Sequence, residues 1–96
     1  MKKIIVSLKA KDDLKEIGVY TDKKWGRKQR IKYLTQLNDR LSYLLENPSF
    51  GRKRVDLPDS PLSYHEARHI IFYRVTKSGI EIIRVLHESM DFPKHL

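Results

Sequence analysis

The chain has 96 residues, 40% of them hydrophobic and 33% charged, which suits a single globular domain over residues 1–96 and argues against disorder. It contains no cysteine, no apolar run near the roughly 18 residues that span a membrane, and an apolar start too short for a signal peptide, so we expect a cytoplasmic protein. The formal net charge of +8 favours a polyanionic partner, which leaves nucleic acid, the ribosome and an acidic protein segment as candidates.

The first part of the chain predicts a strand followed by a helix. Residues 2–8 are a short run rich in β-branched side chains, as in a strand. Residues 10–24 predict a helix, because apolar or small side chains recur at steps of three and four and so share one helical face. These positions are Ala10, Leu14, Ile17 and Thr21. Trp25, at the end of this segment, is interpreted as part of the core or as its lid.

Gly26 separates this helix from a second one, predicted over residues 27–46. Its apolar stripe continues at steps of three and four for more than four turns. The stripe consists of Ile31, Leu34, Leu37, Leu41, Leu44 and Leu45. Asn47-Pro48 ends the helix, because the residue before a proline disfavours the helical conformation. The short connection at Gly26 indicates that the two helices run antiparallel.

The second half of the chain predicts strands. Residues 62–67 form a short strand, and residues 69–75 and 80–87 form a β-hairpin around a Gly-containing turn. If Val75 and Ile80 close that turn, favourable cross-strand pairs follow. The pairs are Arg74–Glu81, Phe72–Ile83 and Ile70–Val85. We expect the two helices to cover the sheet face that carries Ile70, Phe72, Ile83 and Val85, since an apolar face must be buried.

Four segments of the sequence resemble the ParE toxins of the ParE/RelE superfamily. Residues 10–17 are similar to the family pattern A-x-x-D-L-x-E-I, and residues 44–52 to L-x-x-N-P-x-x-G-R. The run I-F-Y-R-V at 71–75 leads to a strand ending in Arg84-Val85-Leu86-His87, and residues 90–96 are similar to the ending M-D-x-P-x-H-L. The resemblance implies an α+β fold with an N-terminal strand and an antiparallel helix hairpin packed on a small, mostly antiparallel sheet.

The resemblance also implies a function. ParE-like toxins poison DNA gyrase and are neutralised by an acidic ParD-like antitoxin in a toxin–antitoxin hetero-oligomer, without a cofactor or a metal ion. The C-terminal end of such toxins is implicated in toxicity, so the expected target-binding residues are Met90, Asp91, Phe92, Pro93, Lys94, His95 and Leu96. Basic side chains are the expected seat for the acidic antitoxin. They are Arg52, Lys53, Arg54, Arg68 and Arg74.

Two alternatives remain open. The first is a RelE-type endoribonuclease that cleaves mRNA on the ribosome. RelE-like enzymes carry an arginine three residues before the strand tyrosine, basic residues after the last strand and often a C-terminal tyrosine; this chain has Ile70, Glu88 and no tyrosine after Tyr73. Residues that would serve catalysis, if they share a sheet face away from the helices, are His69, Tyr73, Arg84 and His87. The second alternative is a basic interaction module without toxicity.

Overall fold

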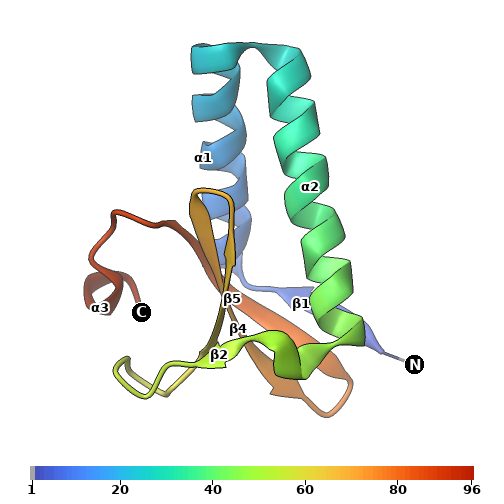
Figure 1. Ribbon diagram of the computed structural model, residues 1–96, viewed down its shortest axis with the longest axis vertical. Coiled ribbons are helices and arrows are strands. Elements are labelled where there is room, and N and C mark those ends of the chain that lie inside the picture. The colour runs from blue at the N-terminus through green and yellow to red at the C-terminus, as the bar shows by residue number, and fades with distance from the viewer. Residues whose placement is uncertain (1) are drawn as a thin grey trace.

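The computed structural model describes residues 2–96, which form a five-stranded sheet with two long helices on one face (Figure 1). The elements are β1 (Lys3–Val6), α1 (Leu8–Trp25), α2 (Arg27–Glu46), the 3₁₀ turn η1 (Pro48–Phe50), β2 (Arg52–Lys53), β3 (Leu62–Glu66), β4 (His69–Thr76), β5 (Gly79–His87) and α3 (Phe92–His95). The α+β architecture is the one that the sequence predicts. Within residues 2–96, no helix is both long enough and apolar enough to cross a membrane.

Local chemistry sets the ends of the two long helices. Ser7 caps α1, because its hydroxyl accepts a hydrogen bond from the Ala10 N–H (3.0 Å) and donates one to the carbonyl of Ile83 (2.7 Å). Gly26, with a φ of 93°, lets the chain turn from α1 directly into α2. α2 ends at Glu46, as Asn47-Pro48 predicted. The antiparallel helix hairpin and both predicted helices are therefore confirmed.

The sheet has the order β1-β5-β4-β3-β2, with β1 parallel to β5 and the other pairs antiparallel. Gly79 opens β5 beside Lys3 at a φ of 154°, and a Cβ there would collide with the Lys3 backbone. β1 therefore reaches the start of β5 only because residue 79 has no side chain. β2 is the edge strand at the opposite side of the sheet, next to β3.

The β4–β5 pairing agrees with the prediction near the turn and departs from it further on. Arg74 lies opposite Glu81, and its Nε is 2.6 Å from the carboxylate. A β-bulge between Phe72 and Tyr73 then shifts the register by one residue. Phe72 consequently faces Arg84 instead of Ile83, and Ile70 faces Leu86 instead of Val85, so both of these predicted pairs are wrong.

The hydrophobic side chains form two clusters, one on each face of the sheet. Under the helices lie Ala10, Ile17, Leu37, Leu41, Leu44, Ile71, Tyr73, Ile80, Ile82 and Val85. On the other face lie Leu57, Ile70, Phe72 and Leu86, with Ile83, Phe92 and Leu96 packed against them. Leu41 and Val85 are under the helices as predicted, but Ile70, Phe72 and Ile83 belong to the opposite cluster.

The end of the helix hairpin also differs from the prediction. Trp25 is 55% exposed and Ile31 is 54% exposed, so neither belongs to the core. Figure 1 shows why: the connection between α1 and α2 extends beyond the sheet, so an apolar residue there has no strand to pack against. Gly18 lies where the helices meet, with Leu34 and Arg30 3.2 and 3.3 Å from the place of a Cβ, so its lack of a side chain permits close packing.

Candidate functional site

The C-terminal tail, Met90–Leu96, begins beside α1 at Met90 and packs Phe92 and Leu96 on the sheet face opposite the long helices. Phe92 packs edge-on against Phe72 with ring centroids 5.1 Å apart, and the Arg54 guanidinium lies 5.7 Å from the Phe92 ring. Leu96 joins the same cluster. The remaining tail residues are exposed: Met90, Asp91, Pro93, Lys94 and His95. Two apolar anchors thus hold a short helix whose other side chains face solvent.

Arg84 joins this tail to the first helix. Its Nε and Nη2 each lie 2.8 Å from the Asp13 carboxylate oxygens, and its Nη1 donates to the carbonyl of His95 (2.8 Å). The backbone N–H of Val85 donates to the same carboxylate (3.0 Å). The hydrogen bonds that Arg84 donates to the Asp13 carboxylate raise the pKa of Arg84 above its usual value. Both side chains are almost buried, at 15% and 9% exposure, so this ion pair is a structural junction of α1, β5 and the tail.

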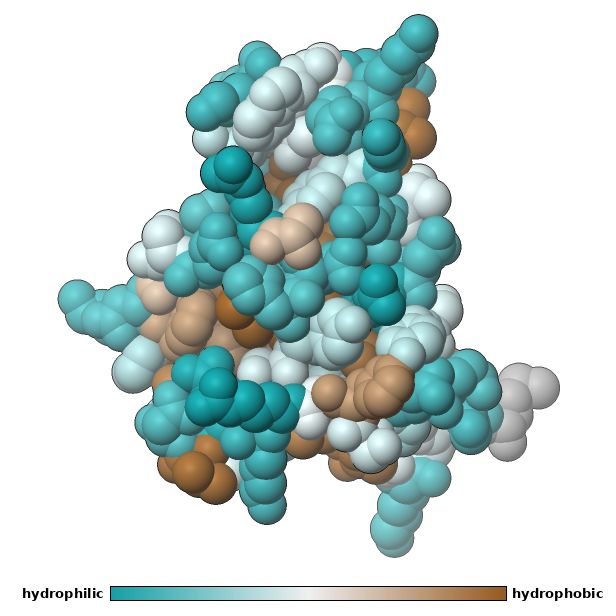
Figure 2. Space-filling view, viewed as in Figure 1, coloured by the Kyte–Doolittle hydropathy of each residue, from teal (hydrophilic) through white to brown (hydrophobic). Residues whose placement is uncertain are grey.

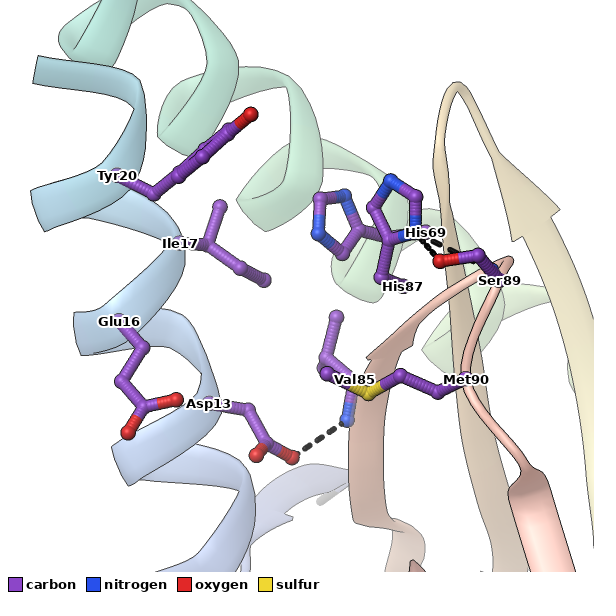
Figure 3. Close-up of a pocket in the computed structure, with 9 residues that line it drawn as sticks. All are labelled: Asp13, Glu16, Ile17, Tyr20, His69, Val85, His87, Ser89 and Met90. Atoms are coloured by element: carbon purple, nitrogen blue, oxygen red, sulfur yellow. Dashed lines mark hydrogen bonds between the residues drawn. The ribbon is translucent and has the colours of Figure 1, made fainter. Parts of the chain in front are cut away.

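A hollow of about 370 Å³, called here the α1 groove, runs between α1 and the end of β5 (Figure 3). It is lined from α1 by Asp13, Glu16, Ile17 and Tyr20, and from the other side by His69, Val85, His87, Ser89 and Met90. Figure 3 shows His69 and His87 side by side above Met90 and facing the helix. The groove therefore combines apolar walls, two carboxylates and the first residue of the C-terminal tail.

The two histidines of this groove are fixed by their neighbours. His69 Nδ1 lies 2.6 Å from the Tyr33 hydroxyl, and the His69 and His87 rings meet edge to face at 5.3 Å. His87 Nδ1 accepts from the Ser89 N–H (3.1 Å) and lies 2.7 Å from the Ser89 hydroxyl. Burial, and then the nearby His87, lower the pKa of His69 to about 4. His69 is therefore neutral at pH 7 and lacks the imidazolium proton that a general acid would donate.

The four candidates for an open catalytic face do not share one. Tyr73 is fully buried beneath the helices, where its hydroxyl donates to the Pro48 carbonyl (2.9 Å) and accepts from the Gly51 N–H (2.8 Å). Burial raises the pKa of the Tyr73 hydroxyl. His69 and His87 face α1, and Arg84 is held by Asp13. The predicted common face is wrong, because His69 and Tyr73 lie on the side of β4 that the long helices cover.

The five basic residues expected to bind the antitoxin do not form one continuous surface. Arg52 and Lys53 make up the edge strand β2 and are exposed. Arg54 is held by both oxygens of Asp56 (3.0 and 2.8 Å), and Arg74 by Glu81. Arg68 lies in the turn between β3 and β4, at the opposite end of β4 from Arg74. No group of three or more His, Cys, Asp or Glu side chains within residues 2–96 is placed to hold a metal ion.

Sequence reasoning missed the α1 groove and the densest basic segment. The groove is built from residues far apart in sequence, so no local pattern marks it. The basic segment was visible: residues 23–32 hold six Lys or Arg and no acidic residue. Lys23 and Lys24 complement the negative end of the α1 dipole, but the positive run continues across Gly26 into α2, where the dipole does not explain it.

Comparison with known proteins defines the class of protein. A solved structure of a chromosomal ParDE toxin–antitoxin system from P. aeruginosa has the same fold, with a TM-score of 0.76 and 19% sequence identity over 91% of this chain and 96% of that one. The family model for the ParE toxin of the type II toxin–antitoxin system parDE matches residues 4–92. The chain therefore belongs to the ParE toxin family.

Named relatives support this over the whole length. Toxin ParE1 of Caulobacter vibrioides is 35% identical over 96 residues, covering 100% of this chain and 99% of the relative. Toxin ParE1 of Mycobacterium tuberculosis is 33% identical over 93 residues, covering 96% and 95%. The chain is thus a ParE toxin of a type II toxin–antitoxin system.

Proposed function

We propose that the toxin inhibits DNA gyrase in the cytoplasm and is neutralised by an acidic ParD-like antitoxin. The observation that carries the proposal is the match to the ParE family over residues 4–92, together with full-length relatives named as ParE toxins. The solved neighbour is a ParDE toxin–antitoxin system, which fits a toxin with a cognate antitoxin partner. The choice of gyrase as the target rests on the family resemblance.

The C-terminal tail is the proposed target-binding element. Phe92 and Leu96 anchor it to the sheet, and Arg84 holds its last turn through the His95 carbonyl. These contacts preorganise the exposed tail residues, which reduces the entropy lost on binding a target. Met90, at 42% exposure, offers an adaptable apolar contact, and Lys94 an exposed cation.

The antitoxin is proposed to bind the basic residues Arg52, Lys53, Arg54, Arg68 and Arg74. The edge strand β2 supports this for its two residues, because an unpaired strand edge accepts an extended peptide through main-chain hydrogen bonds. Arg52 and Lys53 are exposed there and attract an acidic segment. Arg54 and Arg74 already have carboxylate partners, so their contribution to antitoxin binding is smaller.

We propose further that the toxin acts by binding and not by catalysis. A RelE-type nuclease needs free cations and a proton donor around the scissile phosphate. Arg84 is engaged by Asp13, Tyr73 is in the core, and Glu88, which replaces a basic residue of the nucleases, lies 3.0 Å from His65. These placements favour gyrase inhibition over the nuclease alternative.

The test measures supercoiling of relaxed plasmid by gyrase in the presence of the purified toxin. Removing residues 90–96 is a poor variant, because it would uncover Phe72 and the apolar cluster around it. Lys94→Glu changes only an exposed tail residue, and Lys77→Glu makes the same charge change in the exposed β4–β5 turn. We expect inhibition by the wild type and by Lys77→Glu, and at least several-fold weaker inhibition by Lys94→Glu.

Two outcomes contradict this proposal. Equal inhibition by all three proteins would exclude Lys94 from target binding. Ribosome-dependent mRNA cleavage with gyrase unaffected would establish the nuclease alternative instead. A separate titration with a peptide of alternating Glu and apolar residues tests the antitoxin surface: Arg52→Glu combined with Lys53→Glu should weaken binding and reduce its salt dependence.

A further inference from the structure

A second hollow lies at the end of the helix hairpin and serves neither the tail nor the edge strand β2. This helix-hairpin groove has a volume of about 430 Å³ and runs between the hairpin and the β3–β4 turn. Three aromatic rings line it, from Tyr20, Trp25 and Tyr33, together with the cations of Lys24 and Arg68. The rest of the lining is Thr21, Gln29, Gln36, Ala67, His69 and His87. The lining contains no carboxylate, so the groove favours an anionic occupant.

The aromatic rings are open to a ligand. Tyr20 is 57% exposed and Trp25 is 55% exposed, and their rings meet edge to face with centroids 6.2 Å apart. The Lys24 ammonium lies 5.7 Å from the Tyr20 centroid and 5.2 Å from the Trp25 centroid, and it donates to the Tyr20 hydroxyl at 3.3 Å. A positive charge is thus held over two half-exposed aromatic rings. Exposed rings with a cation close by are the combination that binds a base together with its phosphate.

Much of the net charge of the chain is concentrated around this groove. Residues 20–32 contain six Lys or Arg and one Asp, a net +5 (6 − 1) of the total +8. The single acid, Asp22, pairs with Arg30 at 3.1 Å. The other cations of the segment are exposed: Lys23, Lys24, Arg27, Lys28 and Lys32. Figure 2 shows this end of the hairpin, at the top of the view, as a mostly hydrophilic surface.

Helix stability does not account for this charge. Arg27 and Lys28 open α2, at the positive end of its dipole, where cations are unfavourable and the first turn holds no acidic residue to offset them. These cations do not stabilise the helix, but they would attract a polyanion.

We propose that the helix-hairpin groove binds single-stranded nucleic acid, with a base stacked on Trp25 and the backbone phosphates contacted by Lys24 and Arg68. An acidic protein helix is the competing occupant, but such a helix needs aliphatic anchors along its groove. Ala67 is the one purely aliphatic side chain in this lining, whereas the α1 groove has Ile17, Val85 and Met90. The inference goes beyond gyrase inhibition and does not depend on it, because it is tested without gyrase.

The chain carries its own probe for this experiment, because Trp25 is its only tryptophan. The emission of Trp25 is followed while unlabelled oligothymidylate of about 12 nucleotides is added to the full-length toxin, a length within the site sizes of single-strand binders. Stacking should quench the emission. With the two phosphates contacted by Lys24 and Arg68, the slope of log K against log salt should be about −1.4.

Three further ligands separate the possible sources of a signal. Oligouridylate of equal length should also bind, since the groove reads stacking and charge and no deoxyribose contact is invoked. A duplex of the same length should bind more weakly, because its bases are already stacked. An oligoglutamate of equal length should leave the emission unchanged. Equal binding of duplex and single strand, or quenching by oligoglutamate as strong as that by oligothymidylate, overturns the proposal.

Variants place the site. Arg68→Glu should weaken oligothymidylate binding at least fivefold, and Lys77→Glu, the same charge change at the opposite end of β4, should change it less than twofold. Trp25→Leu, followed through a fluorescein-labelled oligothymidylate by anisotropy, should weaken binding about tenfold, the order expected for one lost base stack. Far-UV circular dichroism checks that each variant is folded. Equal effects of the two charge changes would mean that binding reflects general charge attraction, and would refute the proposal that the groove is the binding site.

Discussion

The ion pair between Asp13 and Arg84 offers a sharp test of the structure. Asp13→Asn keeps the size of the side chain but removes the charge that faces the guanidinium. The Asp13 carboxylate accepts two hydrogen bonds from Arg84 (2.8 Å each) and one from the Val85 N–H (3.0 Å), and both side chains are almost buried. Removing one partner of such a pair costs about 3–5 kcal/mol, because the other is left charged and poorly paired.

This loss is large for so small a protein. Folded domains are stable by about 5–15 kcal/mol, so Asp13→Asn should remove a substantial fraction of the free energy of unfolding. Urea denaturation followed by circular dichroism measures it. With a slope of about 1.5 kcal/mol per molar urea, a loss of about 3 kcal/mol lowers the midpoint by about 2 M.

A double-mutant cycle identifies the cause of the loss. Arg84→Met alone should also destabilise, since it leaves the Asp13 carboxylate with the Val85 N–H as its one remaining partner. The cycle is completed by Asp13→Leu alone and by the double variant Asp13→Leu with Arg84→Met. The double variant replaces both charges by apolar groups and should be more stable than the sum of these two single losses predicts. Additive losses, or an Asp13→Asn loss below about 0.5 kcal/mol, would refute the assignment of this pair as a buried junction.

Three further predictions follow from the core and from His69. Leu41→Ala should cost about 2–5 kcal/mol by opening a cavity under the helices, whereas Leu8→Ala, at a position 80% exposed, should cost under about 0.5 kcal/mol by the same urea assay. Gly51→Ala should destabilise the fold, because its Cβ would lie 2.7 Å from ring carbons of Tyr73 and still closer to the hydroxyl. Tyr73→Phe relieves part of that clash, so the double variant should lose less free energy of unfolding than the two single variants together. Strictly additive losses would contradict the contact. The pKa of His69 is lowered from 6.5 to about 4 in the folded state. Between these pH values the unfolded state binds a proton at His69 and the folded state does not, so the free energy of unfolding should fall as the pH drops from 6.5 to about 4. The shift corresponds to at most about 3 kcal/mol, reduced to about 1–2 kcal/mol because the ring is partly open to solvent, and His69→Phe should flatten this part of the urea-midpoint profile against pH.

The helices were predictable because their signal is local. The apolar stripe of α2 repeats every three or four residues, Asn47-Pro48 stops it, and Gly26 marks its start. The start of α1 was predicted at residue 10, whereas the structure begins it at Leu8 behind the Ser7 cap, within the run predicted to be a strand. The β4–β5 turn was equally local, so the pairing of Arg74 with Glu81 followed from the sequence. The likeness of the four motifs to the ParE family rests on the same kind of short, contiguous pattern.

The facing of the strands was not predictable, for a physical reason. Ile70, Ile71, Phe72 and Tyr73 are all almost fully buried, because the long helices cover one face of β4 and the tail covers the other. An alternating pattern tells the faces of a strand apart only when one of them meets water. With both faces buried, nothing in this run showed which side of β4 meets the helices, so Ile70 and Phe72 were assigned to the wrong face. The bulge, at which the pairing skips Ile83 of β5, then separates Ile83 from Val85.

The candidate sites divide along the same line. The sequence by itself determined the segments that carry them: the C-terminal tail, the basic pair Arg52-Lys53 and the positive run at the end of the helix hairpin. Only the tertiary structure decided that Arg84 forms an ion pair with Asp13 and that Tyr73 is a core residue. Only the tertiary structure brings Trp25 and Arg68 to the same groove, because the helix hairpin extends beyond the sheet. Local patterns record how a segment folds, but which side chains meet is set by contacts between segments distant in the chain.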